Sequence, residues 1–176
     1  MELFEAILSR HSYRGKYTSE PVPRDTLIKI MEAGLAAPSG CNAQTTSLIA
    51  VDDPEIIRQL NEIKNRPVGE TAPAMICVLT ERIPSFHGNC YAVQDYSAAI
   101  ENMLLAIVAL GCQSCWVEGY VTDDPEVNRR MSELLKLPEN LELVCLLPVG
   151  IAAEEVKCVP KKEFSERAYF NSYSAE

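Results

Sequence analysis

The sequence predicts one domain of the α/β or α+β class, in which strands alternate with helices. Three apolar runs, at residues 47–51, 74–79 and 141–149, have the length and composition of buried strands. Amphipathic helical patterns separate these runs, and no long linker divides the chain. A length of 176 residues is ordinary for one domain and allows a hydrophobic core without disulfides or metal ions.

Two helical patterns precede the first strand, at residues 2–10 and 23–36. Apolar residues recur at helical spacing in both patterns: Leu3, Phe4, Ile7 and Leu8 in the first, and Leu27, Ile30, Met31, Gly34 and Leu35 in the second. We expect the second helix to end near Pro38, because a proline disfavours helical geometry in the residue before it.

Two later helices carry clear start signals. Asp-Pro-Glu at residues 53–55 and again at 124–126 supplies an N-cap, a proline for the first turn and an early negative charge. These signals predict helices that reach about Ile63 and Leu135.

The longest helix is expected over residues 92–110, after a polar connection at 81–91. Gly111 follows it in the position where helices commonly end on a left-handed residue. After Gly150 the pattern breaks up, and residues 154–176 are polar, rich in charge and tyrosine, and aperiodic. We expect this last segment to be an extension of the domain.

The charge balance is acidic, with a formal net charge of −9. Nucleic acids and anionic membranes need clustered Lys and Arg, so neither is expected as a partner. The longest apolar stretch, residues 103–110, falls far short of the ~20 residues that span a bilayer. The N-terminus lacks the basic start of an export signal, and we expect a cytoplasmic protein.

The chain holds seven cysteines, and an odd number without an export signal favours reduced thiols over a disulfide scaffold. Cys112 and Cys115 form a Cys-x-x-Cys pair, but a structural zinc site needs four ligands and the sequence offers no second pair. A thioredoxin-type pair opens a helix after a strand, whereas this pair follows a long helix. We therefore expect packed, reduced cysteines and no metal site.

Several common catalytic signatures are missing from the sequence. There is no Gly-x-Gly-x-x-Gly, no Walker A glycine loop and no Gly-x-Ser-x-Gly elbow. His11 and His87 are the two histidines, which leaves few candidates for a hydrolytic triad.

Arg10, Ser12 and Arg14 occupy alternate positions where the first helix is expected to end. In an extended segment their side chains point the same way and present two guanidiniums and a hydroxyl. Arginine offers a planar fork to two phosphate oxygens, and Lys161 and Lys162 add positive charge near the C-terminus. By spacing alone, a solvated helix end with two surface arginines remains the commoner explanation.

Residues 37–44, Ala-Pro-Ser-Gly-Cys-Asn-Ala-Gln, join a helix to a strand. Asn42 and Gln44 lie two positions apart, and an extended backbone would aim both carboxamides to one side. A carboxamide both donates and accepts, which suits the edge of an uncharged heterocycle of mixed polarity. A simple turn rich in Pro, Ser, Gly and Asn explains the segment equally well.

Together and in this order, the segments resemble the nitroreductase family of FMN enzymes. Residues 10–14, Arg-His-Ser-Tyr-Arg, are similar to the family's Arg-Arg/His-Ser-x-Arg motif, and residues 37–44 to its Ala-Pro-Ser-x-x-Asn-x-Gln segment. Residues 95–116 resemble the family's long central helix and the turn after it, and the lysine pair resembles its C-terminal basic residue. The resemblance covers about residues 2–170.

The resemblance implies an α+β fold with a central, mostly antiparallel sheet flanked by helices. It implies an intertwined homodimer with two FMN molecules at the interface. Residues 1–176 would form one FMN-binding domain whose segment 154–176 crosses the partner. The FMN-binding residues that it implies are Arg10, His11, Ser12, Arg14, Pro38, Ser39, Asn42, Gln44, Glu118, Gly119 and Lys161.

Individual roles also follow from the resemblance. Arg10 and Lys161 would hold the FMN phosphate, with Lys162 as the other candidate, while Ser12 and Arg14 would lie on the ribityl and pyrimidine side. In the second segment, Asn42 and Gln44 would contact the flavin, and Pro38 and Ser39 would arrive from the partner chain. Backbone groups of residues 117–119 would lie near the isoalloxazine ring.

The implied activity is hydride transfer from NAD(P)H, through flavin N5, to an oxidised acceptor such as a nitroaromatic or a quinone, the two substrates alternating in one site. Arg14 would stabilise the charge on N1 and O2 of the reduced flavin. Two alternatives stay open. One is a flavin-binding redox sensor that uses Cys41, Cys112 or Cys115. The other is a specialised relative, such as a dehalogenase, an ene reductase or a flavin-destroying enzyme.

Overall fold

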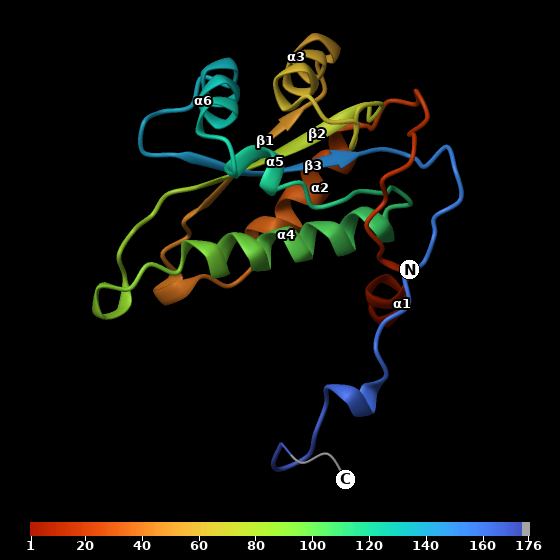
Figure 1. Ribbon diagram of the computed structural model, residues 1–176, viewed down its shortest axis with the longest axis vertical. Coiled ribbons are helices and arrows are strands. Elements are labelled where there is room, and N and C mark those ends of the chain that lie inside the picture. The colour runs from red at the N-terminus through yellow and green to blue at the C-terminus, as the bar shows by residue number, and fades with distance from the viewer. Residues whose placement is uncertain (174–176) are drawn as a thin grey trace.

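The computed structural model describes residues 1–173, which form a three-stranded antiparallel sheet with helices on both faces (Figure 1). The strands are β1 (Thr46–Val51), β2 (Ala74–Thr80) and β3 (Glu142–Val149), in the order β1-β2-β3. The predicted α+β fold with an antiparallel sheet is confirmed. Residues 174–176 of the predicted extension lie outside the described residues.

The predicted helices are present to within a few residues at each end. They are α1 (Leu3–Ser9), α2 (Arg24–Leu35), α3 (Pro54–Lys64), α4 (Ala92–Ala109) and α6 (Pro125–Leu134). The sequence did not predict α5 (Gly119–Thr122) or the 3-10 turns η1 (Gly40–Asn42), η2 (Phe86–Gly88) and η3 (Phe164–Glu166). These elements are too short for a hydrophobic period to develop.

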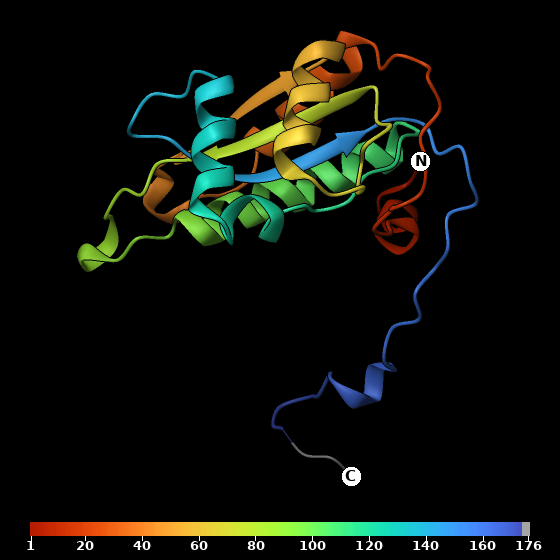
Figure 2. The ribbon, with the colours of Figure 1, turned by 45° about the horizontal axis from the view of Figure 1, so that its top comes forward.

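Alternate residues of β2 contribute to the two halves of the core. Ala74, Ile76 and Val78 belong to the cluster formed with α2 and α4, whereas Met75, Cys77 and Leu79 belong to the cluster formed with α3 and α6 (Figure 2). A strand buried on both faces is continuously apolar, as this one is. The prediction of a buried first strand is wrong, because β1 is only half-buried and Val51 is its one buried residue.

The capping signals act as the sequence predicts. The carboxylate of Asp53 accepts hydrogen bonds from the backbone N–H of Glu55 at 2.8 Å and of Ile56 at 3.3 Å. At the end of α4, Gly111 has a φ of 80°, and its N–H donates to the Val108 carbonyl at 3.0 Å. The next N–H donates to the Ile107 carbonyl at 2.9 Å, which completes a Schellman motif.

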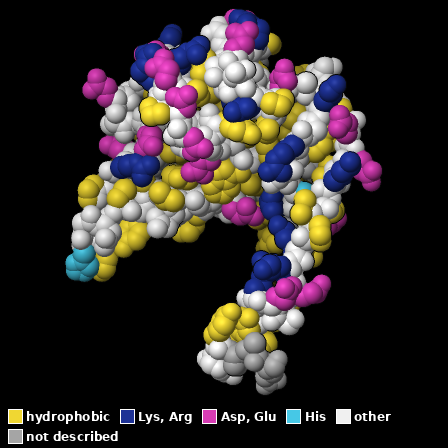
Figure 3. All heavy atoms as spheres, in the orientation of Figure 1, with side chains coloured by type: hydrophobic (Ala, Val, Ile, Leu, Met, Phe, Trp, Pro, Cys, Tyr) yellow, Lys and Arg dark blue, Asp and Glu magenta, His cyan; other side chains and the backbone are white. Residues whose placement is uncertain are grey.

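The C-terminal extension leaves the body of the molecule and carries exposed aromatic side chains (Figures 1 and 2). Phe164 is 68% exposed and Phe170 is 79% exposed. Helix α1 also presents its apolar face to solvent, with Phe4 77% and Leu8 78% exposed, and only Ala6 of this helix is buried. Figure 3 shows further hydrophobic side chains gathered on the underside of the body, where α4 runs in Figure 1.

Within residues 1–173, every helix is too short or too polar to cross a membrane.

Candidate functional site

Tyr13 fixes the backbone of the segment that follows α1. Its N–H donates to the Ser114 carbonyl at 2.8 Å, and its hydroxyl donates to the Lys16 carbonyl and accepts from the Glu154 N–H at 3.3 Å. Its ring packs edge-on against Tyr17, with the centroids 5.0 Å apart. Tyr13 is buried, while Ser12 and Arg14 on either side of it are exposed, so the predicted alternation is present over residues 12–14 but does not extend to the mostly buried Arg10.

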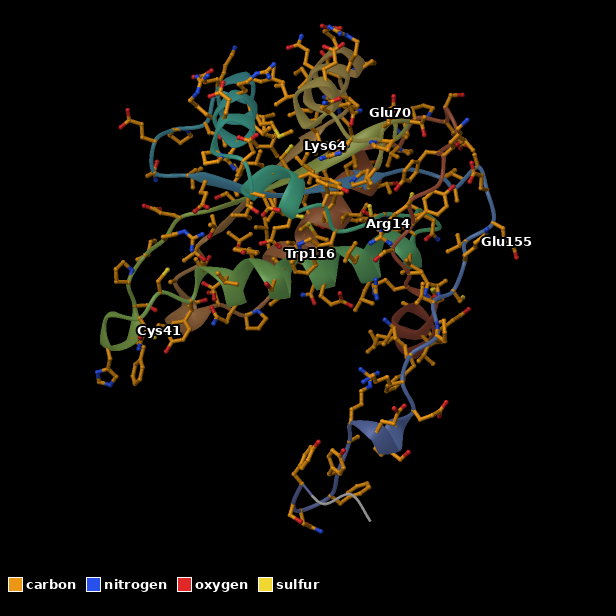
Figure 4. The ribbon with its side chains drawn as sticks, in the orientation of Figure 1. Arg14, Cys41, Lys64, Glu70, Trp116 and Glu155 are labelled. Atoms are coloured by element: carbon orange, nitrogen blue, oxygen red, sulfur yellow. The ribbon has the colours of Figure 1, made fainter. Side chains whose placement is uncertain are left out.

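Arg14 connects residues 10–14 with residues 116–120. Its side chain lines a hollow of about 190 Å³ together with Trp116, Glu118, Gly119 and Tyr120. Figure 4 shows Arg14 and Trp116 on the same side of the sheet, above α4. Arg10 lies four residues earlier in the chain and is largely buried, with its Nε 3.5 Å from Oε1 of Glu101.

The side chain of Glu118 is an anchor inside the protein. Its carboxylate accepts from Nε1 of Trp116 at 2.7 Å and from the hydroxyl of Tyr96 at 3.0 Å. Burial, followed by the hydrogen bond to Glu118, raises the pKa of Tyr96 to about 12. Gly119 and Tyr120 then open α5, where the first N–H groups have no intrahelical partner. The backbone N–H groups at the start of α5 therefore lie at the hollow, beside the indole ring of Trp116, whose position is fixed by Glu118.

Lys64 is a buried cation that was not predicted from the sequence as a site residue. It is 5% exposed, and its ammonium donates to Oδ1 of Asn61 at 2.9 Å and to the carbonyl of Val68, a residue that lines the hollow (Figure 4). Burial lowers its pKa to about 8, although Cys115 and Glu70 act in the opposite direction. Lys64 shares the buried face of α3 with Ile57 and Leu60, and this spacing was the signal for it.

The backbone of residues 37–44 is not extended, so the predicted reason for pairing Asn42 with Gln44 is wrong. Cys41, Asn42 and Gln44 have φ of 52°, 55° and 50°, in the left-handed region. Non-glycine residues persist there only when their surroundings hold them, and such residues cluster at binding sites. Here the N–H of Gln44 donates to Oγ of Ser39 at 3.0 Å and closes the loop.

Asp95 attaches this loop to α4. Its carboxylate is buried and accepts from the N–H of Gly40 and from Oγ1 of Thr45, both at 2.8 Å. A Cβ on Gly40 would lie 2.7 Å from Cβ of Tyr91, so the close approach requires glycine. The loop is thus positioned by a residue on a different element.

One chain does not bring the loop to Arg14. Pro38, Ser39 and Gln44 line a separate hollow of about 170 Å³, and Figure 4 shows Cys41 at the other end of α4 from Arg14. Since the four predicted loop residues share one short segment, a partner that contributed Pro38 and Ser39 would contribute Asn42 as well.

Lys161 and Lys162 are exposed on the C-terminal extension. This extension passes the first segment at Cys158, whose Sγ lies 2.9 Å from Nε2 of His11. Three residues of extended chain span at most about 10 Å, so the backbone of Lys161 lies within about 10 Å of that of Cys158.

The Cys-x-x-Cys pair is packed into the core, as predicted. Cys112 and Cys115 are free and buried, and burial raises the pKa of both thiols, that of Cys115 to about 11. Such thiols form little thiolate at neutral pH. Cys41, by contrast, is exposed.

Replacing Asp95 with alanine should destabilise the protein by about 3 kcal/mol or more, because two hydrogen bonds to a charged group are lost and the partly buried Gly40 N–H loses its acceptor. Thr45→Val removes one of the two contacts and should cost about half as much. Urea unfolding measures both. Equal unfolding midpoints for wild type and Asp95→Ala would refute the anchoring role.

Comparisons with known proteins agree on one family. The model of the nitroreductase family matches residues 7–66 and 61–151. An NADPH-dependent oxidoreductase of Staphylococcus epidermidis is 35% identical over 186 residues, which cover 96% of this chain and 72% of that protein.

Two solved structures are similar over nearly the whole chain. A Bacteroides fragilis nitroreductase with bound FMN has 32% identity and a TM-score of 0.75, covering 93% of this chain and 95% of its own. An FMN-dependent nitroreductase from Clostridium difficile has 26% identity and a TM-score of 0.81, covering 97% and 99%. By the family match, the sequence identity and the shared fold, this chain belongs to the nitroreductase family.

Proposed function

We propose that this protein is an FMN-dependent oxidoreductase that uses NAD(P)H to reduce a small oxidised acceptor, such as a nitroaromatic or a quinone. The observation that carries the proposal is the convergence of Arg14, Glu118 and Gly119, from segments far apart in sequence, on one hollow. The FMN bound to the B. fragilis relative and the NADPH dependence of the S. epidermidis relative support it.

The groups around this hollow fit an anionic flavin nucleotide. Arg10, Arg14 and Lys64 supply positive charge from α1, the following segment and α3, and the start of α5 supplies backbone donors. Guanidiniums suit a phosphate, and a buried ammonium suits the electron-rich edge of a heterocycle. When bound, FMN accepts hydride from NAD(P)H and passes it to the acceptor.

The side chains of this protein would bind and orient the cofactor. Arg10 and Lys161 would hold the phosphate. Arg14 and Lys64 would place two positive charges beside the hollow, where they stabilise negative charge without rearranging. Trp116, fixed by Glu118, would form a wall that limits the access of water.

We further propose that the site is completed in a homodimer of single-domain chains. In one chain the loop at residues 37–44 lies at the far end of α4 from Arg14, so both segments can serve one FMN only across an interface. The exposed apolar faces of α1 and of residues 154–173 supply the surface for such an interface. The C-terminal extension would cross the partner.

The visible absorption spectrum of the purified protein tests the cofactor, and steady-state oxidation of NADH and NADPH tests the activity. We expect a bound flavin and turnover that needs an acceptor such as menadione or nitrofurazone. A folded protein that neither contains FMN nor binds added FMN would overturn the proposal.

The same assays separate the enzyme from a redox sensor. A sensor would bind flavin without sustained turnover and would depend on a reactive thiol. The raised pKa values of Cys112 and Cys115 leave exposed Cys41 as the candidate. Turnover that survives Cys41→Ser excludes the sensor.

Replacing Arg10 with alanine should weaken FMN binding by roughly 1.5–3 kcal/mol, because one charge-assisted phosphate contact is lost. Flavin titration of the cofactor-free protein, followed by fluorescence quenching, measures the change. Arg24→Ala is the control, since Arg24 is exposed and paired with Asp52 at 2.6 Å. Equal affinities for wild type and Arg10→Ala would refute the assignment.

A further inference from the structure

A second and larger hollow lies next to the proposed flavin site. Its volume is about 540 Å³, and it runs between the end of α3 and the α5–α6 region. Gly119, Tyr120 and Asp123 line both hollows, so the two are neighbours. A ligand long enough to pass these three residues could contact both.

Two arginines line this second hollow, Arg66 after α3 and Arg130 on α6. Within residues 1–173, the ion pairs found within 4.0 Å involve neither of them. Their neighbours on the same helices behave differently. Arg58 is paired with Glu55 and Glu62, and Arg129 with Glu126 and Glu133.

The acidic groups of this hollow are largely compensated. Glu62 is held by Arg58, and the carboxylate of Asp124 accepts the Glu126 N–H at 2.9 Å as the N-cap of α6. Asp123 is the remaining acid, and it lines the hollow together with Arg66, Arg130 and the buried Lys64. The lining side chains include three cations and three acids, so the formal charges of the hollow balance in a protein whose formal net charge is −9.

Tyr120 supplies a flat surface at the junction of the two hollows. It is 45% exposed, and the guanidinium carbon of Arg66 lies 5.4 Å from its ring centroid. A cation above an aromatic face is partly desolvated and held in place. Arg66 is thus positioned at the rim without a carboxylate partner, as a phosphate-binding residue requires.

We propose that Arg66 and Arg130 bind the phosphate groups of the nicotinamide dinucleotide while its nicotinamide end reaches the flavin bound at the first hollow. This assignment rests on the function proposed above and names the residues that would hold the reductant. A dinucleotide is long and carries at least two phosphate charges, whereas a nitroaromatic or quinone acceptor is compact and has no need of paired guanidiniums.

The test uses the FMN-loaded protein and two probes that have phosphates but no nicotinamide, ADP-ribose and 2′-phospho-ADP-ribose. Calorimetric titration measures their binding without any turnover. We expect Arg66→Gln and Arg130→Gln each to weaken at least one probe about 10-fold, and the double variant to weaken it further. Arg129→Gln, on the same helix as Arg130 but committed to its ion pairs, should change binding less than about twofold.

The outcomes separate this inference from the proposed function. Equal losses for both probes assign the arginines to the diphosphate, and a larger loss for the 2′-phosphorylated probe assigns them to the ribose phosphate of NADPH. Either result supports the proposal. Wild-type protein that binds neither probe, or a double variant that binds both as wild type does, overturns it while FMN binding stands. Loss of FMN from the double variant would assign the arginines to the flavin and overturn it as well.

Discussion

Replacing Phe164 and Phe170 with serine is expected to convert the proposed homodimer into monomers. The two rings lie 6.5 Å apart at the end of the extension and are 68% and 79% exposed in one chain. Burying one phenylalanine contributes about 1.5–3 kcal/mol, so the four rings of two extensions would contribute about 6–12 kcal/mol. Light scattering coupled to size-exclusion chromatography, over a range of concentrations, measures the change.

The same double variant should also lose FMN, because under this proposal the loop at residues 37–44 and Arg14 share one flavin only across the interface. Ser165→Ala, a change between the two phenylalanines, is the control and should leave the dimer and its flavin content intact. If the Phe164→Ser/Phe170→Ser protein remained a dimer with full FMN content, the extension would not be the interface element that we propose.

The fold was predictable wherever local signals and burial agree. The runs that became β2 and β3 are buried on both faces and therefore continuously apolar, and Asp53 caps α3 as its tripeptide suggests. The first strand was wrongly predicted to be buried, because a half-buried strand can be as apolar as a fully buried one. α5 escaped because four residues contain no period.

The site was predictable in composition and much less so in geometry. Arg14, Glu118 and Gly119 were selected from sequence and do share a hollow. The conformation of Asn42 and Gln44 was not predictable, because it depends on the loop contacts that Asp95 makes, 55 and 50 residues away in sequence from its two partners. No local pattern encodes such a contact.

The burial of Lys64 was likewise not predictable from the local sequence. A lysine in the last turn of a helix normally offsets the helix dipole at the surface. Lys64 is buried instead, next to Cys115, which comes from a distant segment of the chain. Only the fold shows that a charge lies under the hollow.

Lys64 should also make the stability of the flavin-free protein rise with pH. Burial lowers its pKa from 10.5 to about 8, so between these values the unfolded chain holds a proton that the folded chain has released. Stability increases with pH wherever the unfolded state binds more protons, and a shift of this size corresponds to about 3 kcal/mol. Below pH 8 the cost of the buried charge is fully present; above pH 10.5 it is gone.

Comparing wild type with Lys64→Met isolates this contribution, since the other titrating groups largely cancel in the difference. The difference in the free energy of unfolding between wild type and Lys64→Met, measured in urea, should rise in favour of wild type by about 3 kcal/mol between pH 8 and pH 10.5. Lys29→Met removes an exposed lysine from α2, and its free energy of unfolding should change with pH in the same way as that of wild type. Bound FMN should shrink the gain, because negative charge beside Lys64 favours its protonated form and raises its pKa. Parallel curves for wild type and Lys64→Met would mean that the ammonium is solvated, and would remove Lys64 from the proposed site.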